Sequence, residues 1–187
     1  MRLLSLFLLT LTLGYGQALN HVSTLASEVT TVTKTSKSEA ELKTTLTPIL
    51  ESAFDIDRIT RSSFGPIWRT LTPPEQEMAL KHFKKIVLST YLSRLKPAST
   101  LVITFGKETV LQGNTIIPSK LTYEGQTVQV EYRLRQQDTS WKITDVNIEG
   151  VSLVANYRAQ FIGLYGNGGP KGIQNLLSAL ETKANTL

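Results

Sequence analysis

The sequence of 187 residues contains no cysteine and only two histidines. Without cysteine, the chain can form neither a disulfide nor a thiolate metal site. His21 and His82 each lack a second histidine at metal-binding spacing, so we expect no metal site and interpret both as surface residues. The fold must therefore depend on burial of apolar side chains, which make up 41% of the sequence.

Long apolar runs are also scarce. One run covers residues 3–13, directly after Arg2, and small residues follow it up to Gly16 and Ala18. This layout is typical of a secretory signal peptide, so we expect residues 1–18 to be a leader that is cut after Gly16 or Ala18. An uncleaved membrane anchor is the alternative, but the run is well short of the roughly 20 residues that a spanning helix needs.

A strong excess of one charge is missing as well. The net charge is +5, and no basic stripe alternates with aromatic residues, so we expect no nucleic-acid partner. Such a modest positive charge is compatible with weak attraction to anionic lipid headgroups, and equally with ordinary solubility. Residues 19–187 have the length of one domain, without internal repeats or low-complexity linkers, so we expect a single domain.

Apolar residues at helical spacing dominate both ends of this domain. Capping patterns begin at Ser38, Thr72 and Ser152, and Gly166 follows the end of one such pattern. The expected helices cover residues 19–36, 39–53, 56 to the Gly65-Pro66 pair, 73 to about Pro97, 153–165, and a terminal segment around 173–180.

Between these helices the apolar period changes from 3.6 to 2, which indicates strands with one covered face. Turn-forming residues separate them, so an antiparallel meander is expected. Pro118 should lie at a sheet edge or a bulge, because proline cannot donate a ladder hydrogen bond. Four strands are predicted, at residues 101–105, 115–123, 128–135 and 141–148. The order of helices, sheet and helices predicts an α+β domain.

Groups suited to catalysis are few. Asp55 and Asp57 point in different directions on a helix, and Asp55 is more simply a helix cap. The glycines around Gly168 lack the Gly-Lys-Ser/Thr ending of a phosphate-binding loop, and Ser152 lacks the second glycine of a nucleophile elbow. We therefore expect no catalytic residue and no cofactor. From the residues alone, an ordinary packed core and a ligand cavity both remain open.

Three segments together resemble the MlaC family of periplasmic phospholipid-binding proteins. The first is FDIDRITRSSFGPIWRTLTPPEQ, where Phe-Asp precedes Gly-x-x-Trp and a Pro-Glu-Gln helix start. The second, WKITDVNIEGVSLVANYRAQF, runs from a strand through Gly-Val-Ser into Asn-Tyr-Arg. The third is a Gly-Gly pair followed by a leucine-rich terminal helix, residues 168–184. A hopanoid-associated branch shares much of this pattern.

The resemblance implies an NTF2-like α+β fold whose sheet and helices enclose phospholipid acyl chains and leave the headgroup in solvent. It implies a periplasmic carrier with only transient membrane contact and no enzymatic activity. The implied partners are an outer-membrane lipoprotein-porin complex and an inner-membrane ABC-transporter complex containing an MCE-domain protein. The alternatives are a carrier of hopanoids or other apolar ligands, an NTF2-like enzyme, and a pure interaction module.

We assign the pocket to apolar residues that face inward from the long helix, the third and fourth strands and the following helix. They are Phe83, Val87, Tyr91, Val130, Tyr132, Leu134, Ile143, Val146, Ile148, Leu153, Tyr157 and Phe161. Arg158 could reach a phosphate at the pocket mouth, although a structural hydrogen bond to the sheet is the preferred interpretation. Trp68 and Trp141 are expected to anchor helices against the sheet. An enzyme would instead bury Asp55 or Asp145 beside a second titratable group.

Overall fold

The structure is a computed structural model that describes residues 16–97 and 99–187. Most of the expected leader lies outside these residues. The helices are α1 (Gln17–Thr35), α2 (Glu39–Ala53), α3 (Ile56–Phe64), the 3-10 helix η1 (Gly65–Thr70), α4 (Pro73–Leu92), α5 (Leu153–Tyr165) and α6 (Gly169–Asn185). The strands are β1 (Leu101–Phe105), β2 (Thr109–Leu111), β3 (Asn114–Tyr123), β4 (Gln126–Gln137), β5 (Ser140–Ile148) and β6 (Val151–Ser152).

All the strand pairs of the sheet are antiparallel, in the order β1-β3-β4-β5-β6, with β2 also paired to β3. The α+β prediction is confirmed, but the sheet has six strands where the sequence predicted four. The two additional strands, β2 and β6, are three and two residues long, too short to show an alternating pattern. Pro118 lies where β1 stops pairing with β3 and β2 has not yet begun, so it interrupts no ladder bond on that side.

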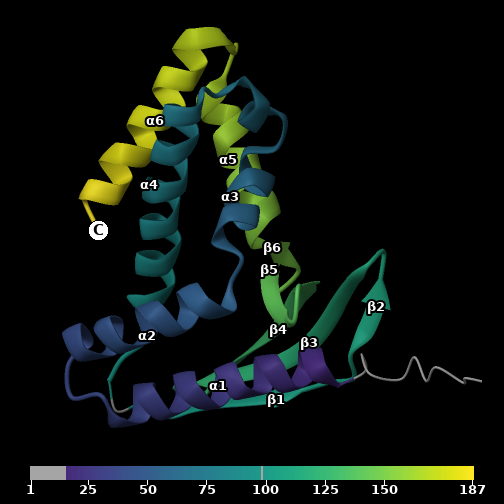
Figure 1. The fold of residues 1–187 in the computed structure, drawn as a ribbon. Coiled ribbons are helices and arrows are strands. Elements are labelled where there is room, and N and C mark those ends of the chain that lie inside the picture. The colour runs from purple at the N-terminus through teal and green to yellow at the C-terminus, as the bar shows by residue number, and fades with distance from the viewer. Residues whose placement is uncertain (1–15, 98) are drawn as a thin grey trace, which may run out of the picture.

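Helix α1 lies along the sheet, whereas α3, α4, α5 and α6 form a separate group that rises from the sheet at strand β5 (Figure 1). The connection is made where Phe54 forms a parallel bridge with Ile143 and the Asp55 N–H donates to the Ile143 carbonyl at 2.9 Å. Because α3 follows directly, this contact fixes where the helical group leaves the sheet.

The helical group has its own core, which we call the helical core. Phe64, Phe83, Tyr157 and Phe161 form its centre, with ring centroids 4.7 Å apart for Phe83–Tyr157 and 4.8 Å for Phe64–Phe161. Edge-on and tilted ring pairs at this distance add attraction beyond the apolar area they bury. The face of α6 that carries Leu176 closes this core.

A second cluster, the sheet core, lies between the sheet and α1. Ile117, Leu134 and Ile143 are fully buried there beneath Ala18 and Val22 of α1. A third cluster joins α2 to α4 through the buried leucines Leu42, Leu46, Leu88 and Leu92. The interior is therefore divided among three apolar clusters.

The predicted helix caps are present. Asp55 Oδ1 accepts from the Arg58 N–H at 2.9 Å, and Ser152 Oγ accepts from the Ala155 N–H at 3.0 Å. Gly65 has φ +57° and ends α3, but the chain continues into η1 instead of a loop. Helix α4 ends at Leu92, five residues before Pro97, so the predicted end was too late.

Candidate functional site

The structure places ten of the twelve predicted pocket residues in two separate clusters. Phe83, Val87, Leu153, Tyr157 and Phe161 are buried in the helical core, and Tyr91 packs against it partly buried. Leu134 and Ile143 are buried in the sheet core, with Tyr132 and Val146 partly buried at its margin. On the same strands, Val130 is buried and Ile148 is half-buried.

The two cores meet at Phe54, which packs against both. We call the partly buried side chains on either side of this contact the seam: Phe54, Tyr91, Tyr132, Val146 and Val154. Their burial is incomplete because each stands at the margin of its own cluster. Phe54 is therefore the contact through which the two cores, each holding part of the predicted lining, meet.

The phenols of this region are kept neutral by their surroundings. Burial raises the pKa of Tyr91, with Asp145 adding to the shift and Arg94 opposing it. Burial also raises the pKa of Tyr132, and that of Tyr157. Protonated phenols can both donate and accept hydrogen bonds. The seam thus offers apolar surface and neutral hydroxyls.

Asp145 and Asp55, the carboxylates that an enzyme could use, have structural partners. Asp145 accepts from Ser152 Oγ at 2.6 Å, the Val146 N–H at 2.9 Å and the Val154 N–H at 3.1 Å, so it ties β5 to the start of α5. Asp55 is the cap of α3. Across the residues that the structure describes, no three metal-ligating side chains gather in one place. Both aspartates are only partly buried, and each has a structural hydrogen-bond role.

Arg158 has a structural hydrogen bond, but with a helix instead of the sheet. Its Nε and Nη2 donate to the Ser62 carbonyl at 2.9 and 2.5 Å, near the end of α3. Gly65 lies beside it with φ +57°, a backbone conformation that favours glycine, and a Cβ there would be 3.3 Å from Arg158 Nε. The preferred interpretation was therefore right about the kind of role and wrong about the partner.

Two other predictions need correction. Trp68 packs within the helical group, 5.7 Å from Phe64 and beneath the Arg61 guanidinium, whereas Trp141 does pack at the sheet core as expected. His21 is not a simple surface residue, since its Nε2 is buried without a hydrogen-bond partner among the described residues. The periodicity of α1 could not reveal which of its polar residues turns inward.

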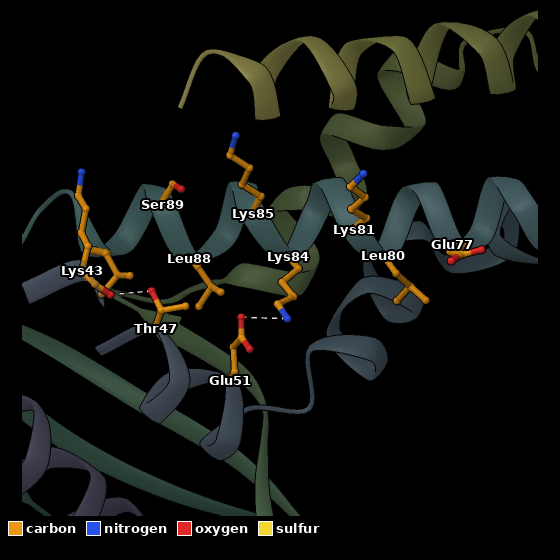
Figure 2. A pocket seen from close by; sticks show the side chains of 11 residues that line it. Lys43, Thr47, Glu51, Glu77, Leu80, Lys81, Lys84, Lys85, Leu88 and Ser89 are labelled. Atoms are coloured by element: carbon orange, nitrogen blue, oxygen red, sulfur yellow. Dashed lines mark hydrogen bonds and ion pairs between the residues drawn. The ribbon is translucent and has the colours of Figure 1, made fainter. Parts of the chain in front are cut away.

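Sequence reasoning missed a groove of about 560 Å³ between α2 and α4. Figure 2 shows Lys84 reaching toward Glu51, at 2.9 Å, while Lys81 and Lys85 point away from α2. A hollow of about 240 Å³ lies beside it and shares Glu51 and Lys84. None of the twelve predicted pocket residues lines either hollow. The lysines of α4 are a visible signal in the sequence, but the groove itself depends on how α2 packs.

The apolar side chains at the base of the groove are already buried by packing within the protein. Leu88 and Leu92 belong to the third cluster and are 8% and 3% exposed.

Within the described ranges, no helix is both long and apolar enough to cross a membrane.

Comparison with known proteins identifies the fold. The sequence model of the family described as MlaC protein matches residues 20–182. A phospholipid-binding protein from Ralstonia solanacearum, solved in complex with a phospholipid, superposes with a TM-score of 0.81 at 20% identity, over 91% of this chain and 98% of that one. No curated protein matches in sequence. Since the family model covers most of the sequence and the fold agrees, the chain belongs to the MlaC family.

Proposed function

We propose that this chain is a periplasmic phospholipid carrier that holds acyl chains between its helical core and its sheet core. The observation that carries the proposal is membership of the MlaC family, together with a similar fold solved with a phospholipid bound. Each CH₂ group transferred from water to an apolar site contributes about 0.8 kcal/mol. A carrier therefore needs apolar surface above all, and the two cores supply it.

The seam is the place where tails would enter. Its side chains are partly buried, so fewer contacts are lost there than in the centre of either core when the helical group moves away from the sheet. The pocket assignment stays with the twelve residues named above, and separation of the two cores would expose them on both sides of one cavity. Phe54, which touches both cores, lies at the hinge side of that movement.

The transport role is part of the same proposal. The leader is removed by a cut after Gly16 or Ala18, and the rest of the chain forms the exported domain. The carrier exchanges lipid with an outer-membrane lipoprotein-porin complex and an inner-membrane ABC-transporter complex containing an MCE-domain protein. Lipid moves without catalysis, in keeping with the structural roles of Asp55 and Asp145.

Native mass spectrometry of protein purified from a Gram-negative periplasm tests the proposal. Val130→Arg places a charge in the proposed lining and should lower the fraction of lipid-bound protein at least tenfold relative to the exposed control Arg135→Ala. Ile148→Arg, at a half-buried position, is a second variant less able to disturb folding, which circular dichroism checks. Equal lipid occupancy in all folded variants would refute the pocket, and wild-type protein that never carries lipid would refute the carrier.

A further inference from the structure

The start of α1 has a feature that lipid binding does not explain. Two peptide bonds fit the small-residue rule for leader removal: the bond after Gly16, with Gly14 two residues before it, and the bond after Ala18, with Gly16 two residues before it. The sequence does not separate them. We infer that the leader is cut between Gly16 and Gln17, and that Glu108 then pairs with the new amino terminus.

The burial of the flanking residues distinguishes the two candidate cleavage bonds. Ala18 is 0% exposed and belongs to the sheet core with Val22, whereas Gln17 is exposed. A cut after Ala18 would remove a core methyl group and place the new ammonium on Leu19, which packs against the same cluster. A charge beside an apolar cluster is unfavourable unless it is paired. A cut after Gly16 keeps the core whole and leaves the charge at an exposed residue.

A carboxylate already lies at this position. Glu108, in the segment between β1 and β2, accepts from the Gly16 N–H through Oε1 at 3.0 Å. Its Oε2 is buried and has no hydrogen-bond partner among the described residues. The first turn of α1 has no acidic residue, and its N-cap provides no side-chain hydrogen bond. Glu108 therefore supplies from another element the negative charge that α1 lacks.

Cleavage gives this carboxylate a stronger partner. Water adds to the Gly16 carbonyl, the bond to Gln17 breaks, Gly16 leaves as the carboxylate end of the leader, and the Gln17 nitrogen becomes an ammonium group. A positive charge at a helix N-terminus is repelled by the helix dipole. Glu108 already binds the N–H of Gly16, and Gln17 is the next residue, with its Cα about 3.8 Å from that of Gly16. Glu108 offsets the repulsion and gains donors for its unpaired oxygen.

This inference rests on the proposed leader but not on lipid binding. One protein sample tests leader cleavage and lipid binding separately. The precursor is expressed in a Gram-negative host, and intact mass with N-terminal sequencing is recorded on the periplasmic protein. We expect a chain that begins at Gln17 with a free amino group. A chain that begins at Leu19 would overturn the cleavage site, and cyclised, neutral Gln17 would overturn the ion pair. Unprocessed protein would overturn both the cleavage site and the ion pair. Bound lipid in the same spectra would still test the carrier proposal on its own.

Thermal melting tests the role of Glu108. In processed protein, Glu108→Gln should lower the melting temperature by about 2–4 °C, whereas the control Glu131→Gln, on β4, should not. In an unprocessed chain that keeps Tyr15 and Gly16 in front of Gln17, no ammonium lies beside Glu108, so the same substitution should have a clearly smaller effect. Equal losses in the two chains would overturn the ion pair.

Discussion

The helical core and the sheet core differ in what fills them. The helical core interlocks four aromatic rings and is closed by α6, so its centre has little freedom to rearrange. The sheet core is smaller and mainly aliphatic, and polar atoms of His21 and Trp141 are buried beside α1 and β5 without partners among the described residues. A tightly packed region maintains shape, whereas a small one with incomplete contacts can yield. In the proposed carrier, we expect the sheet side to be the part that rearranges to admit lipid.

Matched leucine truncations should show the largest difference between the two cores. Leu176 and Leu134 are both 0% exposed, one in each core. Leu176→Ala should lower the free energy of unfolding by about 4–5 kcal/mol, because the rigid surroundings keep the cavity open, and Leu134→Ala by about 2–3 kcal/mol. Urea denaturation of both variants measures this. Equal costs would mean that the sheet core is as rigid as the helical core.

Asp145 links the two regions, and its loss should have the next largest effect. Asp145→Ala removes an acceptor from the Ser152 hydroxyl and from two backbone N–H groups, at a cost of about 1.5–3 kcal/mol. Hydrogen exchange should show faster exchange of the Val154 amide at the start of α5. Glu181→Ala, on the exposed face of α6, is the control. Unchanged protection of Val154 would show that β5 and α5 are held together by other contacts.

Arg158 stabilises the helical group alone, so its removal should cost less. Arg158→Ala loses two donors to the Ser62 carbonyl in an exposed position, worth about 0.5–1.5 kcal/mol. Lipid occupancy should stay at the wild-type level, because both hydrogen bonds of this side chain go to Ser62 of α3 and neither goes to a seam residue. A strong loss of lipid with little loss of stability would instead favour a headgroup contact.

The sheet core should show the weakest but most specific signal, a dependence on pH. Burial lowers the pKa of His21 below 6.5, so protons bind the unfolded chain more readily and stability falls as the pH drops below that value. Melting temperatures between pH 8 and pH 5 should fall less steeply in His21→Gln than in the wild type, with His82→Gln measured as the matched control. Identical slopes in the wild type and His21→Gln would show that His21 binds protons equally well in the folded and unfolded chains.

Local chemistry made much of the fold predictable. The cap at Ser38, the Glu75 carboxylate that accepts from the Thr72 N–H, and the caps at Asp55 and Ser152 act within a few residues, so their patterns gave the helix starts closely. The alternation of β4 predicted its buried face in the same way. The short strands β2 and β6 were missed because their pairing depends on neighbours and not on their own residues.

The candidate site was predictable only in part. The apolar faces were identified, yet the sequence could not show that Trp68 packs among helices, that Arg158 binds α3, or that a groove with several lysines lies between α2 and α4. Each of these features depends on two elements that are distant in the chain. The local sequence of neither element indicates how the two pack against each other.

By itself, the sequence determined the helix and strand types, the lack of cysteine-based stabilisation, and the family resemblance, because these follow from residue identity and spacing. Only the tertiary structure decided that the apolar residues divide into separate cores that meet at Phe54, and that Ala18 belongs to the folded domain. The physical reason is that periodicity states which face of an element is buried, whereas the surface that buries it is chosen by packing among all the elements at once.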